Sequence, residues 1–252
     1  MQPEIVLRDG DLLQRPEALE ILQLARQKTK GPLELWTSGL NLARPGVVEA
    51  VLRAGANLLA VPLYGDGAES HDWLTGQPGH FQRTIAGLKR ARALGSKVAV
   101  IAPLLRPSFR NLPLLVQKSH ALEVSSFHFV TLPGPDRAGQ PLLPSLEMVA
   151  PHLRQALNMV QAGKRRATVL DVPACLLAER APLTMADDHK EMAPTAVDLP
   201  TREYGPPCEA CTWRGTCPGL LATTATRFGW AGLMARTDLP PKESAPGVKN
   251  AK

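Results

Sequence analysis

The chain has 252 residues, of which 44% are hydrophobic and 4% aromatic, and its formal net charge is +6. This length can bury a sizeable core, but no apolar run reaches the roughly 18 residues of a membrane-spanning helix, and the start lacks the apolar run of a secretory signal. Because the basic residues are scattered along the chain, we do not expect a nucleic-acid partner.

Short apolar runs alternate with helical patterns over the first two thirds of the chain. Strands are predicted at Glu4–Leu7, Leu33–Trp36, Asn57–Tyr64, Lys97–Ala102 and Ser126–Leu132, and a further apolar run, Ala167–Pro173, follows the last of the helices. Helical spacing of apolar residues is found at Arg15–Thr29, Arg44–Gly55, Phe81–Gly95, Leu112–Glu123 and Leu143–Gly163. Strand and helix alternate about every 30 residues, which predicts an α/β fold with a parallel sheet.

The pattern changes after the last predicted strand. Residues 181–207 form a polar, proline-containing stretch, and a short helix is predicted to end near Gly229. The final residues are polar and rich in proline and lysine, and we expect the segment 233–252 to be a disordered tail.

All four cysteines of the chain, Cys175, Cys208, Cys211 and Cys217, are candidate metal ligands. The last three have the spacing C-x2-C-x5-C, and Gly215 is expected to allow the tight return that brings Cys217 round. We expect a cytoplasmic, reducing location, in which such thiols favour a metal over disulfides. Four thiolates suit a tetrahedral zinc ion or a [4Fe–4S] cluster, and their spacing does not separate the two. Either site would be coordinatively closed.

Several segments together resemble the radical SAM superfamily. Residues 5–22 resemble its second strand and the following Gly-Gly-Glu-Pro turn, with Asp9, Gly10, Asp11 and Leu12 at the turn. Residues 33–42 are similar to the third-strand segment, and residues 58–100 match the fourth strand, a His-Asp loop, a helix and the fifth strand. The cysteine run resembles the SPASM and twitch extensions, which hold auxiliary iron–sulfur clusters.

The resemblance implies an open partial (β/α) barrel of parallel strands, with its first strand missing and a small cysteine-rich C-terminal extension. The corresponding division is a partial barrel at 1–172, an auxiliary-cluster segment at 173–232 and the tail at 233–252. The superfamily's C-x3-C-x2-C motif, which holds the SAM-cleaving cluster, does not occur in the sequence. The turn at Asp9–Leu12 is a degenerate candidate for cofactor binding, and S-adenosylmethionine is not expected as a firm ligand.

The resemblance supports three interpretations of function. In the first, the protein keeps an auxiliary [4Fe–4S] cluster and acts as scaffold, electron relay or subunit beside a complete radical SAM enzyme, with a peptide as the expected substrate. In the second, the chain is part of a radical SAM oxidoreductase whose N-terminal cluster motif lies outside it. In the third, it is a structural zinc protein. An uncovered first strand would favour pairing with another chain, either a radical SAM enzyme or a second copy.

A few other residues carry chemistry of their own. His71 and Asp72 suit acid–base work, although the more ordinary interpretation is that Asp72 caps a turn and Trp73 covers the core. The positions of His120 and His128 in patterned segments favour core or surface roles over metal ligation. Three further polar residues follow the fifth strand of the resemblance and are candidates for an anionic ligand: Arg106, Arg110 and Asn111.

Overall fold

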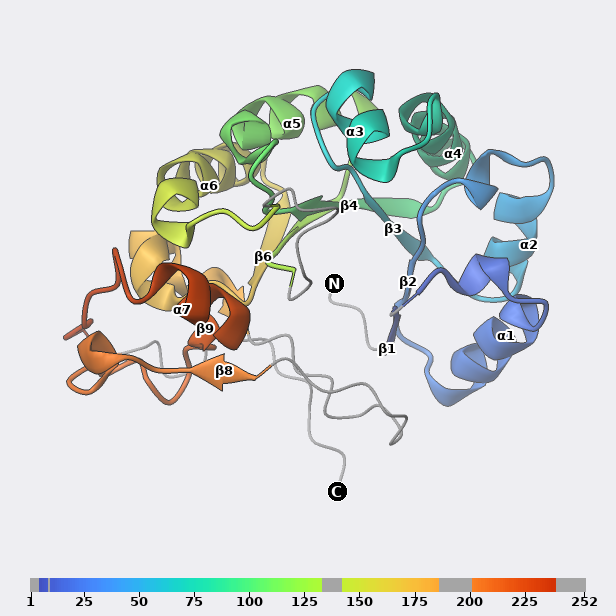
Figure 1. Ribbon diagram of the computed structural model, residues 1–252. Helices are drawn as coiled ribbons and strands as arrows, with labels where there is room; N and C mark the ends of the chain where they lie inside the picture. Colours follow the sequence, from blue (N-terminus) through green and yellow to red (C-terminus); the bar gives the residue numbers. More distant parts are fainter. Residues whose placement is uncertain (1–4, 9, 133–141, 186–200, 239–252) are drawn as a thin grey trace.

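The computed structural model describes residues 5–8, 10–132, 142–185 and 201–238. Within them, one sheet has seven strands, which follow chain order and pair in parallel throughout. The strands are β1 (Ile5–Leu7), β2 (Leu33–Trp36), β3 (Leu58–Pro62), β4 (Lys97–Pro103), β5 (Ser126–Val130), β6 (Arg166–Leu170) and β7 (Thr184–Met185). The sheet curls into a half-barrel with helices on its convex side (Figure 1), which confirms the predicted partial barrel.

Along the described residues, one α-helix follows each of β1, β2, β4 and β5, two consecutive α-helices follow β3, and a 3-10 helix follows β6. The α-helices are α1 (Ala18–Lys28), α2 (Val47–Arg53), α3 (Ala68–Thr75), α4 (His80–Ala93), α5 (Leu112–Ser119) and α6 (Leu146–Ala162). Short 3-10 helices complete the connections: η1 (Leu12–Gln14), η2 (Asn41–Ala43), η3 (Phe109–Asn111), η4 (His120–Leu122), η5 (Ala174–Leu183) and η6 (Pro206–Cys208). Helix α3 is a difference from the sequence-based expectation, which treated its residues as a loop. No helix among the described residues is long and apolar enough to cross a membrane.

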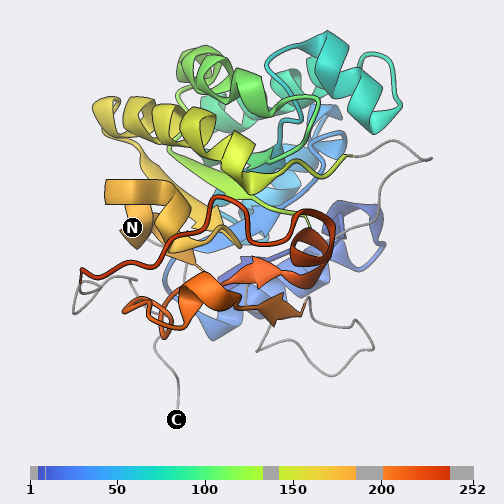
Figure 2. The same cartoon turned by 60° about the vertical axis from the view of Figure 1, so that its left-hand side comes forward.

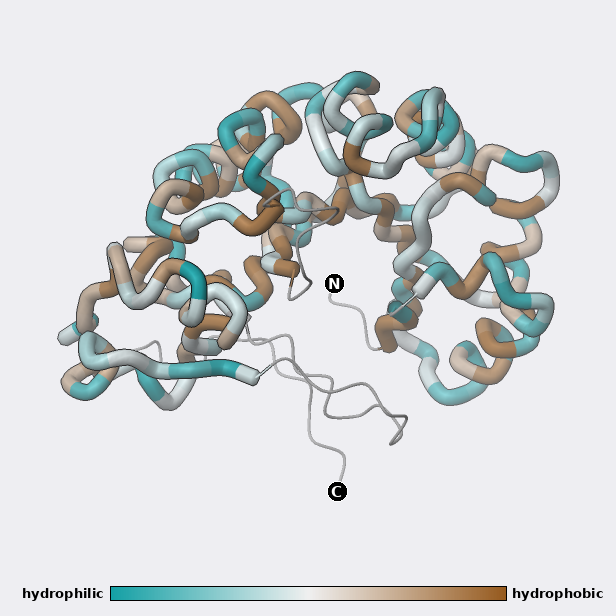
Figure 3. The backbone as a smooth tube through the Cα atoms, in the orientation of Figure 1, coloured by the Kyte–Doolittle hydropathy of each residue, from teal (hydrophilic) through white to brown (hydrophobic). Residues whose placement is uncertain are grey.

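The main core lies between the sheet and the helices. Side chains alternate along each strand, so that Leu59 and Val61 of β3 face the helices, whereas Leu58 and Ala60 belong to a smaller apolar cluster of Leu58, Ala60, Ala99, Ile101, Val130 and Leu170. The strands are accordingly among the most hydrophobic parts of the chain (Figure 3). Burial on both faces explains why these strands read as short continuous apolar runs.

A polar bridge spans the strands on the face that carries the smaller cluster. Glu34 of β2 is 1% exposed, and its carboxylate lies 3.0 Å from Nε2 of His128 on β5. The same carboxylate accepts a hydrogen bond of 2.9 Å from the indole of Trp36, and Nδ1 of His128 lies 2.6 Å from the Thr168 hydroxyl on β6. His128 therefore has a role inside the fold, as expected from its place in a strand.

The C-terminal part of the chain adds a second, two-stranded antiparallel sheet of β8 (Arg202–Glu203) and β9 (Leu220–Leu221), followed by α7 (Ala222–Phe228). It lies beside η5 and α6 at one end of the half-barrel (Figure 2). Helix α7 ends where predicted, at Gly229, which has a left-handed φ of 62°.

Residues 233–238 differ from the expected disordered tail, because they contact the cysteine loop through several hydrogen bonds. Leu233 is buried in the main core and fixes the start of this segment. The remaining residues of the predicted tail lie outside the described residues, as do most of those between β7 and β8.

Candidate metal centre

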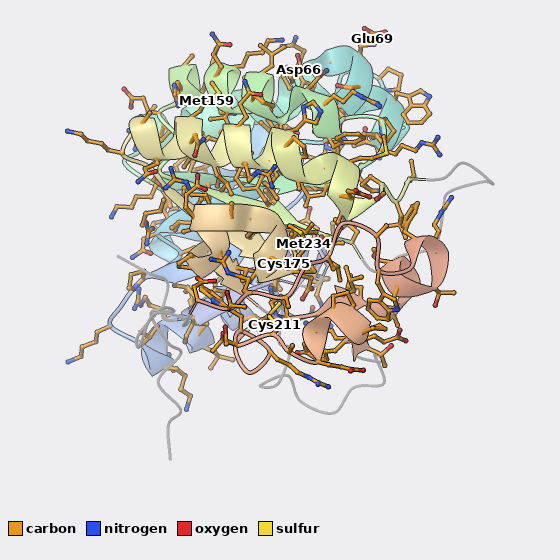
Figure 4. The ribbon with its side chains drawn as sticks, turned by 90° about the vertical axis from the view of Figure 1, so that its left-hand side faces the viewer. Asp66, Glu69, Met159, Cys175, Cys211 and Met234 are labelled. Atoms are coloured by element: carbon orange, nitrogen blue, oxygen red, sulfur yellow. The ribbon has the colours of Figure 1, made fainter. Side chains whose placement is uncertain are left out.

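The fold brings all four cysteines to one pocket. Cys175 comes from η5, the element that follows β6, whereas Cys208, Cys211 and Cys217 come from the loop between β8 and β9. The pocket between them is small and opens to solvent, and Trp213, Tyr204, Leu233 and Met234 are among the other residues of its wall. Figure 4 shows Cys175, Cys211 and Met234 close together below α6, whereas Asp66 and Glu69 lie above that helix.

Backbone N–H groups point at three of the four sulfurs. Cys217 Sγ accepts from the N–H of Ala174 at 3.3 Å and of Gly219 at 3.5 Å. Cys211 Sγ accepts from the N–H of Arg236 at 3.4 Å, and the N–H of Met234 bonds to Cys175. Hydrogen bonds of this kind stabilise thiolates and are a recognised feature of the surroundings of metal–sulfur sites.

Burial acts in the opposite direction on two of these thiols. It raises the pKa of Cys175 and of Cys217, and the neighbouring cysteines, if ionised, would raise both pKa values further. The N–H bonds lower the same pKa values without offsetting the burial. Without a metal, the thiols of Cys175 and Cys217 are therefore largely protonated near neutral pH, and a bound metal centre would have to displace their protons.

The four cysteines line one pocket without forming a ready-made metal site. No three Cys, His, Asp or Glu side chains within residues 5–8, 10–132, 142–185 and 201–238 form a group that could hold one metal ion as the side chains stand. The donor set nevertheless suits a sulfur-rich centre: four soft ligands face one pocket, and N–H donors already point at the sulfurs.

The loop that carries three of the cysteines is closed at its base by the pairing of β8 with β9, in which Glu203 is opposite Leu220. The Tyr204 hydroxyl donates to the carbonyl of Cys217 at 2.9 Å across this base. Gly219, not Gly215, makes the sharp return: its φ is +75°, and a side chain there would place Cβ 2.8 Å from the carbonyl oxygen of Glu203. The Pro218-Gly219 dipeptide was the available sequence signal for this turn.

Gly219→Ala is expected to destabilise the C-terminal segment by about 1–2 kcal/mol, since an L-residue in the left-handed region carries this strain even before the contact with Glu203 is counted. Gly215→Ala is the matched control, because a Cβ at Gly215 meets no atom within 4 Å. Urea unfolding of both variants and the unchanged protein measures the difference. Equal stability of the two variants would contradict the prediction.

The segment is attached to the half-barrel by a buried ion pair. Asp171 follows β6, has a φ of 58°, and its side chain is 3% exposed. The Arg202 guanidinium of β8 donates to its carboxylate from Nε at 3.0 Å and from Nη2 at 2.9 Å. Aspartate tolerates the left-handed conformation better than most residues, which helps it to end the strand here.

The chain is similar to known proteins in part of its sequence and in its fold. No family model matches the chain. The AdoMet-dependent heme synthase of Methanosarcina barkeri is 40% identical over 93 residues, which make up 36% of this chain and 26% of that protein. The structure is similar to that of Streptococcus suis SuiB, with a TM-score of 0.52 at 14% identity over 65% of this chain and 38% of SuiB. SuiB has also been solved with S-adenosylmethionine and with its precursor peptide SuiA.

A further similar structure is a domain of a pyruvate-formate lyase-activating enzyme from Bacteroides vulgatus, with a TM-score of 0.50 at 18% identity over 67% of this chain and 99% of the domain. The chain is related to the radical SAM enzymes. The relationship predicted from the sequence is thereby confirmed, while the matched region spans only about a quarter of the heme synthase. The likeness to the solved structures concerns the radical SAM fold.

Two of the segments that resemble radical SAM motifs meet in the structure. The Asp11 carboxylate accepts hydrogen bonds from the Thr37 hydroxyl at 2.7 Å and from the Ser38 N–H at 3.2 Å. It also accepts a hydrogen bond from the Ser38 hydroxyl. Asp11 also caps η1 through the N–H of Leu13. Asp9 lies outside the described residues. This carboxylate therefore ties the turn after β1 to the end of β2.

The segment that resembles the radical SAM His-Asp loop forms α3 and the start of α4. Asp72 accepts from the N–H groups of Gly79 at 2.6 Å and Phe81 at 2.7 Å, as the capping interpretation predicts, and these bonds lower its pKa. His71 is fully buried, and burial lowers its pKa to about 4. The prediction that Trp73 covers the core is wrong, because its side chain is 53% exposed.

The three polar residues after the fifth strand of the resemblance do not form one anion site. Asn111 donates to Asp66 at 3.0 Å, while the guanidinium of Arg110 lies over the ring of Phe109. Arg106 is exposed, and its backbone N–H bonds to Leu142. An acidic partner for Asn111 and a separate aromatic partner for Arg110 give no shared surface for an anion.

Proposed function

We propose that Cys175, Cys208, Cys211 and Cys217 hold an auxiliary [4Fe–4S] cluster in a protein related to the radical SAM enzymes. The observation that carries this proposal is the convergence of all four cysteines on one pocket from two separate parts of the chain. The N–H bonds to sulfur support it, because they stabilise thiolate ligands. We further propose that residues 173–232 are a SPASM- or twitch-like segment.

Zinc is the alternative occupant, since four thiolates also make a closed structural zinc site. The backbone N–H bonds to the sulfurs favour the cluster, because hydrogen bonds to sulfur are one means by which proteins stabilise and tune iron–sulfur clusters. The relationship to the radical SAM enzymes, for which iron–sulfur chemistry is general, favours the same choice.

The role that suits a closed cluster is that of scaffold or electron relay. When bound, such a cluster supplies one-electron transfer, while its four protein ligands leave no iron open to substrate. The protein would therefore act with a SAM-cleaving centre located elsewhere, on a second chain or on a further segment of the same polypeptide. In the second case it is part of a radical SAM oxidoreductase. We place it in a reducing, cytoplasmic compartment, where cysteines remain available as ligands.

Two substrate classes follow from the relatives. The structure of SuiB bound to its precursor peptide suggests a peptide substrate, but the similarity between SuiB and this chain is one of fold. The heme synthase points to a tetrapyrrole, and it is supported by 40% sequence identity over about a third of the chain. Titration of the reconstituted protein with a porphyrin and with an unstructured peptide separates them: a shifted porphyrin absorption band supports the second class.

Anaerobic reconstitution with iron and sulfide tests the proposed cluster. We expect a brown protein with about four irons per chain and a broad absorption band near 400 nm. A colourless protein that binds one zinc and no iron contradicts the proposal and supports the structural zinc site. Incubation with S-adenosylmethionine and a strong reductant tests the role: production of 5′-deoxyadenosine by these 252 residues alone contradicts the scaffold or relay role.

A further inference from the structure

The segment of residues 233–238, named here the strap, lies along the cysteine loop. The Thr212 N–H donates to the Arg236 carbonyl at 2.9 Å, and the Trp213 indole donates to the Asp238 carbonyl at 3.0 Å. Leu233 is buried in the main core at the start of the strap. The strap is thus held at both ends, and its N–H groups reach Cys175 and Cys211.

The Arg236 side chain joins the three segments that build the pocket. Its Nη1 donates to the carbonyl of Ala178 in η5 at 2.7 Å, and its guanidinium lies 4.7 Å from the centre of the Trp213 ring. Ala178 has a φ of 51° and a ψ of −125°, a conformation unusual for a residue with a side chain. Arg236 therefore contacts both the element that carries Cys175 and the loop that carries the other cysteines.

Arg236 also has a counter-charge within the strap. Its Nε and Nη2 donate to the two carboxylate oxygens of Asp238 at 2.9 and 2.7 Å. The Arg236 side chain is 19% exposed, whereas that of Asp238 is 54% exposed. The cation is consequently the less hydrated member of the pair. Its own backbone N–H donates to Cys211 Sγ at 3.4 Å, and its Nη1 contacts η5, the element that carries Cys175.

We propose that Arg236, with Asp238 as its counter-charge, sets the reduction potential of the cluster held by the four cysteines. This inference depends on the cluster proposed above. When bound by these cysteines, such a cluster would supply one-electron transfer with an external one-electron donor: no bond or proton would change, and reduction would make the centre one unit more negative. A nearby cation stabilises the more negative form and raises the potential, and a nearby carboxylate lowers it.

The test is a spectroelectrochemical titration of the reconstituted protein and two variants. Arg236→Gln is expected to lower the potential, with about a tenfold fall in the equilibrium constant for reduction, or ~59 mV for one electron. Asp238→Asn is expected to shift it in the opposite direction by a smaller amount, because Asp238 is more exposed. Opposite shifts are the decisive signature, since simple loosening of the strap has no reason to give them.

Arg236→Lys and Arg83→Gln are the controls. Lysine keeps the positive charge, so Arg236→Lys should have a reduction potential close to that of the unchanged protein. Arg83 lies on α4, away from the cysteines, and Arg83→Gln should leave the potential nearly unchanged. Equal potentials in all variants, or shifts of the same sign for Arg236→Gln and Asp238→Asn, overturn the inference while leaving the cluster intact. If Arg236→Gln assembles no cluster, the potentials of the other two variants test the inference. It then requires a higher potential in Asp238→Asn and a nearly unchanged one in Arg236→Lys. Absence of any cluster in the unchanged protein overturns the proposed function itself.

Discussion

The double variant Cys208→Ala/Cys211→Ala is expected to retain less than about one iron per chain, where the unchanged protein retains about four. The pair lies on one turn after β8 and supplies half of the sulfur ligands, so that its removal leaves only Cys175 and Cys217 at the pocket. Two thiolates cannot hold a cubane against chelation. Iron and sulfide analysis after gel filtration, together with the absorption band near 400 nm, measures the loss.

The half-barrel of this variant should remain folded, because its main apolar core is formed almost entirely by residues outside the cysteine loop. A circular dichroism spectrum like that of the unchanged protein is the control for this point. Gly215→Ala keeps all four thiols and is expected to keep the iron as well. Full iron content in the double variant would place the metal elsewhere and remove the basis of the proposed function.

The architecture of the half-barrel was predictable because each strand and helix carries its own local signal. The predicted strand at Leu33–Trp36 coincides with β2, and the helical spacing around Phe81 marks α4. These elements are buried on defined faces, and burial is what produces the patterns. Helix α3 was missed, because it is a short element between glycines at Gly67 and Gly76, and five of its residues look like a polar loop.

The cysteine positions were equally visible in the sequence, but the groups that surround them were not. Arg236 reaches Ala178 over 58 residues of sequence, and Ala174 donates its N–H to Cys217 over 43 residues. Such contacts depend on how β8, β9 and the strap are placed against the half-barrel. No local pattern encodes that placement, and the polar composition after residue 232 suggested disorder instead.

Arg202→Met is expected to lower the free energy of unfolding by about 3–5 kcal/mol, because it leaves the Asp171 carboxylate buried without the guanidinium beside it. Asp171 is held at the end of β6 only a few residues before Cys175, and Arg202 belongs to the strand that begins the cysteine loop. The loss should therefore weaken the cluster as well as the fold. Urea unfolding and the rate of iron loss to a chelator measure the two effects.

The double variant Asp171→Asn/Arg202→Met tests whether the destabilisation comes from the buried Asp171 charge or from the loss of the Arg202 side chain itself. Once the carboxylate is neutral, the removal of Arg202 no longer leaves a buried charge, and part of the stability should return. Arg15→Met is a suitable comparison, since the Arg15–Glu17 pair is 3.8 Å apart and mostly exposed, and its loss should change little. If Arg202→Met were no more destabilising than Arg15→Met, the ion pair would not be what attaches the cysteine segment to the half-barrel. If it is destabilising and the double variant recovers, the Asp171–Arg202 pair is one of the contacts that fix the cysteine segment to the end of β6, beside the burial of Leu233 in the main core.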